Sequence, residues 1–313
     1  MATPYAAATA DGELLEWLAG GVTQVLLDST QTEGRLAMFR SAAPAGAASP
    51  AHVHTWEDEI LVLLRGSATL WVGDRRHELG TGAVAFLPHG VPHAYRITAE
   101  SDLLLLTTPG GLENFVHDAG AADNGQIILG PPSCPDDFLP DYPGALDLPP
   151  YVAGGDQHET LEWFDGALVR ILLDQKRTGG RFSMGRSTFP AGSASPVYVH
   201  GKEDEAIVLL RGSAIYWVGE HRYDVSAGDV VLVPRGVSTA HRMTADTEIL
   251  VVTTPGGLEE LFRQAGRDVS QPRPDGWRIS FDTLVRAAAA TGQTILAAPL
   301  QADEAISARL VAA

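Results

Sequence analysis

Three histidines and one glutamate in the first third of the chain have the spacing of metal ligands. His52 and His54 are separated by one residue, Glu59 follows five positions later, and His93 comes just after a Pro88–Gly90 turn segment. Imidazole nitrogens and a carboxylate oxygen suit divalent transition metals, and four such ligands leave positions open for substrate, water or dioxygen. The pattern predicts one divalent ion (Fe, Mn, Ni, Co, Cu or Zn) bound by His52, His54, Glu59 and His93.

Glu59 has two candidate roles that the residues alone leave open. A carboxylate can serve as an ordinary fourth ligand. It can also accept a proton from an acidic hydroxyl or enol, which makes Glu59 the candidate catalytic base.

Short strands must bring these four side chains together. His52 and His54 project from one face of an extended segment, because side chains alternate along a strand. Glu59 has the opposite parity, so the polar segment 55–58 is expected to form a turn into a returning apolar strand over 59–64. His93 is expected on a third strand.

The same residues resemble the two sequence motifs of the cupin family. The first motif is matched by Gly46, His52, His54, Glu59 and Gly66, and the second by Gly82, Pro88, Gly90 and His93. Ile97 replaces the asparagine that often closes the second motif, a position that does not bind metal in the family. The resemblance implies an all-β fold of the cupin type, a double-stranded β-helix or jelly roll.

An internal repeat extends the resemblance to nearly the whole chain. Residues 15–120 align without a gap to residues 161–266, at an offset of 146. Such self-similarity indicates duplicated domains. We therefore expect two cupin barrels, a bicupin, with an N-terminal barrel over 1–132, a Pro/Asp-rich linker over 133–150 and a C-terminal barrel over 151–313.

A second repeated segment shows that the two copies differ in length near their C-terminal ends. Gly125–Leu129 recurs as Gly292–Leu296 at an offset of 167, so the second copy carries an insertion of 21 residues. Within it, Ser280–Ala290 has a leading serine, an early aspartate and an alanine run, which predicts a capped peripheral helix near the C-terminus.

The second copy keeps only half of the metal motif. The counterparts of His52, His54, Glu59 and His93 are Tyr198, His200, Glu205 and Thr239. His241 lies two residues after Thr239 and is a substitute ligand candidate, so metal binding through His200, Glu205 and His241 stays open. The favoured expectation is a mainly structural second barrel.

Parity also suggests residues near the predicted metal. Tyr95 shares a strand face with His93, and Leu61 and Leu63 share one with Glu59, so the three could line an apolar cavity. Trp56 is a candidate mouth residue. Trp71 recurs in the second copy, which favours a role in the core.

Composition restricts the expected partners and cellular location of the protein. The net charge is −17 and no Lys/Arg run occurs, which argues against nucleic-acid partners. The chain has one cysteine, no signal-peptide pattern and no membrane-length apolar run, so a cytoplasmic protein without a membrane partner is expected. The bias for Arg over Lys and for Ala suggests a bacterial source. A monomer or homodimer acting on a small-molecule substrate is expected.

The arrangement as a whole resembles the quercetin 2,3-dioxygenase type of bicupin. That resemblance implies a metal-dependent dioxygenase for an aromatic or enolisable substrate, with Glu59 as ligand and base and dioxygen as co-substrate. Two alternatives remain. One is a non-oxidative isomerase, cyclase or decarboxylase with the metal as Lewis acid. The other is a small-molecule-binding protein without turnover.

Overall fold

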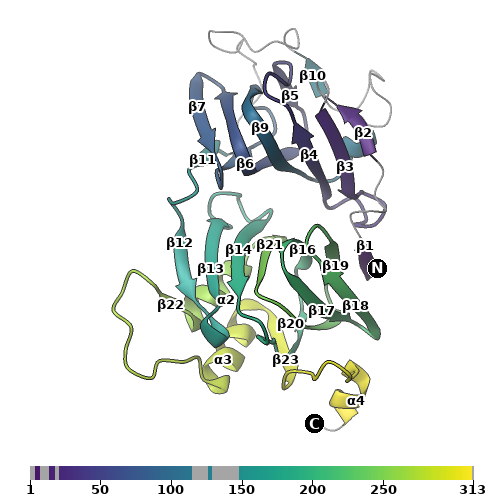
Figure 1. The fold of residues 1–313 in the computed structure, drawn as a ribbon, viewed down its shortest axis with the longest axis vertical. Helices are drawn as coiled ribbons and strands as arrows, with labels where there is room; N and C mark the ends of the chain where they lie inside the picture. Colours follow the sequence, from purple (N-terminus) through teal and green to yellow (C-terminus); the bar gives the residue numbers. More distant parts are fainter. Residues whose placement is uncertain (1–3, 8–13, 18–20, 115–125, 129–147, 312–313) are drawn as a thin grey trace. The chain divides into compact units, whose positions relative to one another are not determined.

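Two compact β-rich units make up the chain (Figure 1). The computed structural model describes all residues except 1–3, 8–13, 18–20, 115–125, 129–147 and 312–313. One unit comprises Gly12–Gln157, and the other combines Met1–Asp11 with His158–Ala313. Antiparallel strands dominate both units, which confirms the predicted all-β class. Most of the expected linker lies outside the described residues.

The first unit is built from one branched sheet that closes around an apolar core. The strand order is β11-β8-β6-β9-β4-β3-β2, with β7 also on β6, β5 on β9 and β10 on β5. The strands are β2 (Leu14–Trp17), β3 (Gly21–Leu27), β4 (Ala37–Ala43), β5 (His52–His54), β6 (Asp58–Val72), β7 (Arg75–Gly80), β8 (Val84–Leu87), β9 (His93–Thr108), β10 (Gln126–Ile128) and β11 (Tyr151–Ala153).

The second unit consists of two sheets. Their orders are β1-β19-β16-β21-β14-β13-β12-β22 and β18-β17-β20-β15-β23. The strands are β1 (Tyr5–Ala7), β12 (Glu159–Glu162), β13 (Leu168–Leu173), β14 (Ser183–Phe189), β15 (Val197–His200), β16 (Asp204–Arg211), β17 (Ser213–Val218), β18 (His221–Ser226), β19 (Val230–Val233), β20 (Ser238–Met243), β21 (Thr247–Thr254), β22 (Arg267–Asp268) and β23 (Gln293–Ala297).

The leading strands of the two copies are exchanged between the units. Tyr5–Ala7 pairs with β19 of the second copy, and Tyr151–Ala153 pairs with β8 of the first. The 146-residue offset of the repeat relates β1 to β11, and it relates their partner strands β8 and β19 to each other. The two units therefore differ from the predicted barrels over 1–132 and 151–313. Residues 1–11 belong to the second unit and residues 151–157 to the first, because each leading strand forms its hydrogen bonds there.

Continuous apolar runs explain the barrel cores. Within β6, Ile60–Leu63 is at most 2% exposed, because this strand packs on both of its faces. Gly66 bends the same strand with a φ of 95°, and a Cβ there would meet the Glu100 carbonyl oxygen at 2.4 Å. Gly212 makes the same close approach in the second copy, so both barrels need glycine at this position.

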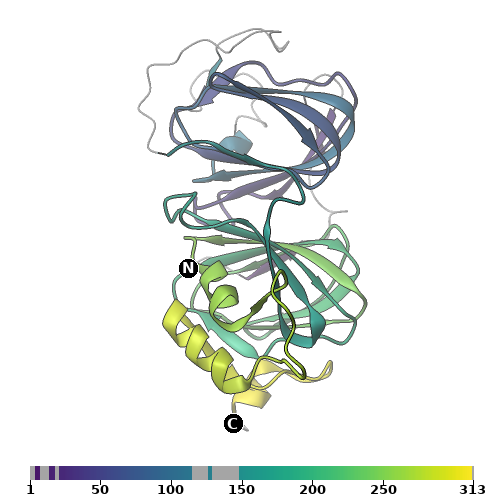
Figure 2. The ribbon, with the colours of Figure 1, turned by 90° about the vertical axis from the view of Figure 1, so that its left-hand side faces the viewer.

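Helices are few and peripheral. Those that lie wholly within the described residues are α2 (Leu258–Ala265), α3 (Phe281–Thr291), α4 (Ile306–Val311) and a 3₁₀ turn over Phe164–Gly166. The predicted capped helix is confirmed as α3, where the Ser280 side chain accepts a hydrogen bond from the Thr283 backbone N–H. Figure 2 shows α3 lying against the second barrel, and its buried Leu284 joins that barrel's core. Among the described helices, none is long and apolar enough to cross a membrane.

Candidate metal centre

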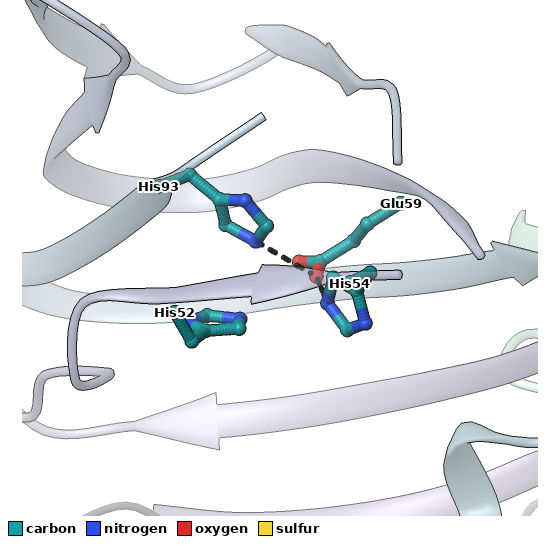
Figure 3. A group of neighbouring side chains, drawn as sticks. All are labelled: His52, His54, Glu59 and His93. Carbon is teal, nitrogen blue, oxygen red and sulfur yellow. Dashed lines mark hydrogen bonds and ion pairs between the residues drawn. The ribbon is translucent and has the colours of Figure 1, made fainter. Parts of the chain in front are cut away.

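Three neighbouring strands of the first barrel carry the four predicted ligands. His52 and His54 are the two ends of β5, Glu59 is the second residue of β6, and His93 begins β9. His52 pairs directly with His93 across the β5–β9 ladder. Figure 3 shows the four side chains turned toward a common space, with the Glu59 carboxylate between the His54 and His93 rings.

The ligand atoms of these residues converge. One donor atom from each of His52, His54, Glu59 and His93 lies within 4.8 Å of all the others. The Glu59 Oε2 atom is 2.8 Å from His54 Nε2 and 3.3 Å from His93 Nε2. All four side chains are buried, so neither water nor surface charge competes strongly for the donor atoms.

The outer contacts of the histidines fit a metal ion. His52 Nδ1 lies 2.8 Å from the Pro50 carbonyl oxygen, and His93 Nδ1 lies 2.9 Å from that of Val91. A carbonyl only accepts, so each Nδ1–H must donate, which leaves the Nε2 lone pair of a neutral ring facing the cluster. Lone pairs gathered around a carboxylate repel one another unless a cation lies among them. The four side chains therefore form a site suited to a divalent metal ion.

Electrostatics keep Glu59 ionised. Burial raises the pKa of Glu59, but the close contacts with His54 and His93 outweigh it and hold the pKa well below its usual range. Burial lowers the pKa of His54, yet Glu57 and Glu59 together raise it to about 9. Burial, with the neighbouring His93 and His54, lowers the pKa of His52 well below its usual range. The carboxylate is thus charged and able to bind a cation.

The sequence-based interpretation of the 55–58 turn was wrong in part. Glu57 and Asp58 were expected in a polar turn, but each is 1% exposed. Both are buried because they have partners: Glu57 Oε2 lies 3.6 Å from His54 Nδ1, and Asp58 Oδ1 accepts from the backbone N–H of His89 and contacts its Nδ1. Asp58 thereby ties the turn before His93 to the strand that carries Glu59.

A signal for these supporting residues was present in the repeat. Glu57 and Asp58 recur as Glu203 and Asp204, whereas the exposed Trp56 between the ligand strands does not recur. Glu203 Oε2 again lies 3.6 Å from the histidine of its own copy, and Asp204 holds Arg235. Repetition of two acidic residues in both copies is unusual for a solvated turn and pointed to buried partners.

The predicted pocket residues lie in the barrel core. Leu61, Leu63 and Tyr95 are buried and belong to one apolar cluster. Trp71 is also buried, with Ala94 in a small separate cluster, which agrees with its expected core role. Trp56 is 53% exposed, a position compatible with a mouth residue.

The second barrel arranges its counterpart residues differently. His200 Nε2 lies 3.3 Å from Glu205 Oε2, and the Tyr198 hydroxyl donates to the same oxygen at 3.2 Å. The Thr239 hydroxyl turns away and donates to the Trp217 carbonyl at 2.8 Å. His241 lines a cavity with Tyr198, His200 and Glu205. Within the part of the chain described, the converging cluster of metal-ligand atoms is that of the first barrel.

Comparison with known proteins agrees with the fold and the site. Residues 39–109 and 185–254 each match the family model described as a cupin domain. The chain is therefore a bicupin, with one cupin domain in each unit.

Its relatives are enzymes. Over 297 residues the chain is 26% identical to a quercetin 2,3-dioxygenase of Bacillus subtilis (strain 168), covering 84% of this chain and 86% of that enzyme. Over 129 residues it is 29% identical to a quercetin 2,3-dioxygenase of Aspergillus japonicus, covering 39% of this chain and 37% of that enzyme. Among solved structures, oxalate decarboxylase from Bacillus subtilis superposes with a TM-score of 0.61 at 17% identity, covering 80% of this chain and 76% of that one, which shows a shared fold.

Proposed function

We propose that this bicupin is a metal-dependent dioxygenase acting on an aromatic or enolisable substrate, with its active centre in the first barrel. The observation that carries the proposal is the convergence of three histidines and an ionised glutamate within 4.8 Å. The similarity to a quercetin 2,3-dioxygenase along 84% of the chain supports the reaction class.

Some residues of the site would bind the metal ion, and others orient the residues that bind it. His52, His54, His93 and Glu59 would hold the ion, which supplies a Lewis-acidic centre with free positions for small oxygen ligands. The Pro50 and Val91 carbonyls fix two imidazole rings, and Glu57 supports the third. Such outer contacts orient metal ligands and raise their basicity.

Glu59 is the proposed base. Its carboxylate is ionised and buried, so it can take a proton from an acidic hydroxyl that approaches the centre. The surrounding apolar strands limit water access and so strengthen charge interactions at the site. Deprotonation of the substrate would increase its electron density and its reactivity toward dioxygen.

A non-oxidative reaction is the second candidate. A Lewis-acid centre with a nearby carboxylate could also catalyse isomerisation or decarboxylation without dioxygen. Oxalate decarboxylases share the fold, and an assay with and without dioxygen separates the two reaction classes.

Oxygen consumption tests the proposal directly. The metal-loaded protein should consume dioxygen with quercetin or a related polyphenolic enol, and no turnover should occur in anaerobic buffer. Turnover that continues without dioxygen would favour the non-oxidative class and contradict the proposal.

His93→Ala and Thr239→Ala form a matched pair for the site itself. His93→Ala removes one of four ligands and should abolish metal retention and oxygen consumption. Thr239→Ala alters the counterpart in the second barrel and should leave both within about twofold of wild type. Elemental analysis after dialysis measures retention. Equal effects of the two substitutions would contradict the assignment of the centre to the first barrel.

A further inference from the structure

A cavity of about 90 Å³ lies inside the second barrel. Aromatic side chains form much of its wall, including Trp163, Phe189 and Phe262. It contains the position that corresponds to the metal centre of the first barrel, marked by His200 and Glu205. The second copy thus encloses a space just where its metal motif is incomplete.

Besides the His200 ring, three polar groups on the cavity wall lack a hydrogen-bond partner in the protein. The Tyr216 hydroxyl, the Ser193 hydroxyl and the Gln293 side-chain amide nitrogen are buried atoms without a hydrogen-bond partner. Their residues are 1%, 4% and 2% exposed, respectively. A buried polar group without a partner costs about 1–3 kcal/mol, so three around one cavity suggest that a ligand satisfies them.

Two of these groups, Tyr216 and Ser193, are additions of the second copy rather than remnants of a metal site, whereas Gln293 corresponds to Gln126 of the first copy. Tyr216 stands where the first copy has Leu70, and Ser193 stands where it has Ala47. Simple loss of a metal site would remove ligands without replacing core leucine and alanine by hydroxyl groups. The substitutions point to a different ligand.

The available donors define the chemistry of that ligand. The Gln293 amide nitrogen can only donate, and the amide oxygen already accepts from the Thr291 hydroxyl. Burial raises the pKa of Tyr216 above its usual range, so this group also stays protonated. Gln293 can only donate and the two hydroxyls can donate, so the ligand must offer at least one acceptor atom.

The charges on the cavity wall and the cavity volume further restrict the class of ligand. Burial lowers the pKa of His241 to about 4, so this wall residue is neutral near pH 7. The charges of His200 and Glu205 oppose each other across 3.3 Å. A neutral ligand is favoured, because a net charge would lack a counter-charge. The volume is below the roughly 150 Å³ of an enclosed apolar cavity that accepts benzene, so the ligand is limited to a single ring; the cavity is not fully enclosed, so part of that ligand can extend out of it.

We propose that the second barrel binds a neutral, single-ring aromatic molecule with a carbonyl or similar acceptor oxygen, without a metal ion. The ring lies between the aromatic walls, and the oxygen accepts one or two hydrogen bonds from the donors Tyr216, Ser193 and Gln293. This site is independent of the proposed dioxygenase centre, because all of its residues belong to the second unit.

Calorimetric titration with acetophenone and ethylbenzene tests the proposal. The two probes have nearly the same shape, but only acetophenone carries an acceptor oxygen. Acetophenone should bind the full-length protein about three to ten times more tightly than ethylbenzene, as one to two hydrogen bonds require. Its affinity should be the same after chelation of the first-barrel metal.

Tyr216→Phe separates binding from a structural role. The substitution should abolish the preference for acetophenone while leaving the melting temperature unchanged or higher, since it removes an unpaired buried hydroxyl. Tyr223→Phe is the matched control, because Tyr223 lies in the same barrel but outside the cavity wall. Its affinity for both probes should equal that of wild type.

Three results would overturn the proposal. The first is no binding of either probe at millimolar concentration. The second is an equal effect of Tyr216→Phe and Tyr223→Phe on acetophenone affinity. The third is retention of a second metal ion that His241→Ala removes, which would assign the cavity to a metal centre.

Discussion

At the level of single residues, the two barrels share a histidine backed by a glutamate but differ in what surrounds it. His54 Nδ1 and His200 Nδ1 each lie 3.6 Å from the carboxylate three residues later. In the first barrel His52 and His93 complete a ligand set. In the second, Tyr198 and Thr239 occupy those positions and form hydrogen bonds instead.

This shared contact provides a matched test of metal binding. Glu57→Gln should weaken metal affinity about 10- to 100-fold, as is typical when an outer carboxylate of a metal-bound histidine is changed. Glu203→Gln removes the same charge at the same distance in the second barrel and should not alter affinity. Competition titration with a chelating dye measures both variants. A comparable loss in Glu203→Gln would contradict a centre confined to the first barrel.

His241 predicts a pH dependence of stability. Its folded pKa of about 4 lies below the ordinary value of 6.5, so the unfolded state binds the proton more readily. The contribution of the neutral ring is complete above about pH 6.5 and is lost as the pH falls toward 4. The loss is on the order of 1–3 kcal/mol.

Unfolding in denaturant at pH 7 and pH 5 measures this contribution. His241→Gln should lose less stability than wild type over that interval, because glutamine does not titrate. His221→Gln changes an exposed histidine of the same barrel and serves as control. Parallel pH profiles for wild type and His241→Gln would contradict the assignment.

At the level of elements, short strands and tight turns position the ligands. Gly90 N–H donates to the His54 carbonyl at 2.8 Å, and Gly236 N–H donates to the His200 carbonyl at the same distance. This bond fixes the turn before β9 against the end of β5. Both copies keep it, so the framework of the site persists even where the ligands have changed.

The cap of α3 gives a prediction for a peripheral element. Ser280→Ala removes the side-chain acceptor for the Thr283 N–H and should lower the free energy of unfolding by about 1 kcal/mol. Because α3 packs into the second barrel's core, that barrel should carry the effect. Chemical denaturation measures it, with Ser307→Ala, an exposed serine in α4, as control. An unchanged midpoint would mean that the cap contributes little.

At the level of the whole molecule, the exchanged strands link the N-terminus to the second barrel. Tyr5–Ala7 forms the edge of the sheet that contains β19, whereas Tyr151–Ala153 extends the sheet of the first copy. Each barrel is completed by a strand that the repeat assigns to the other copy. Neither half of the sequence therefore contains all the strands of one unit.

Deletion of residues 1–11 tests this arrangement. The amides of β19 that face β1 should exchange hydrogen at least about tenfold faster, since they lose their partners. Metal retention by the first barrel should not change. Deletion of residues 1–3 alone keeps β1 and should have no effect on exchange. Faster exchange in the first barrel instead of β19 would contradict the observed pairing.

The sequence by itself determined the four residues of the proposed ligand set, the two cupin domains and helix α3. His52, His54, Glu59 and His93 lie within 42 positions of one another in strands and turns with clear local signals. The helix likewise carries its own cap at Ser280. Local spacing and repetition are sufficient for features of this kind, because side-chain alternation and capping depend on near neighbours.

Only the tertiary structure decided the strand exchange, the burial of Glu57 and Asp58, and the polar cavity of the second barrel. The unpartnered polar groups of this cavity lie far apart in the sequence, on Tyr216, Ser193 and Gln293. They come together only when strands β17 and β23 and the loop that carries Ser193 surround one cavity. The exchange of β1 depends on which of two equivalent sheet edges it pairs with. Hydrogen bonds and packing between distant segments settle such questions, and no local pattern encodes them.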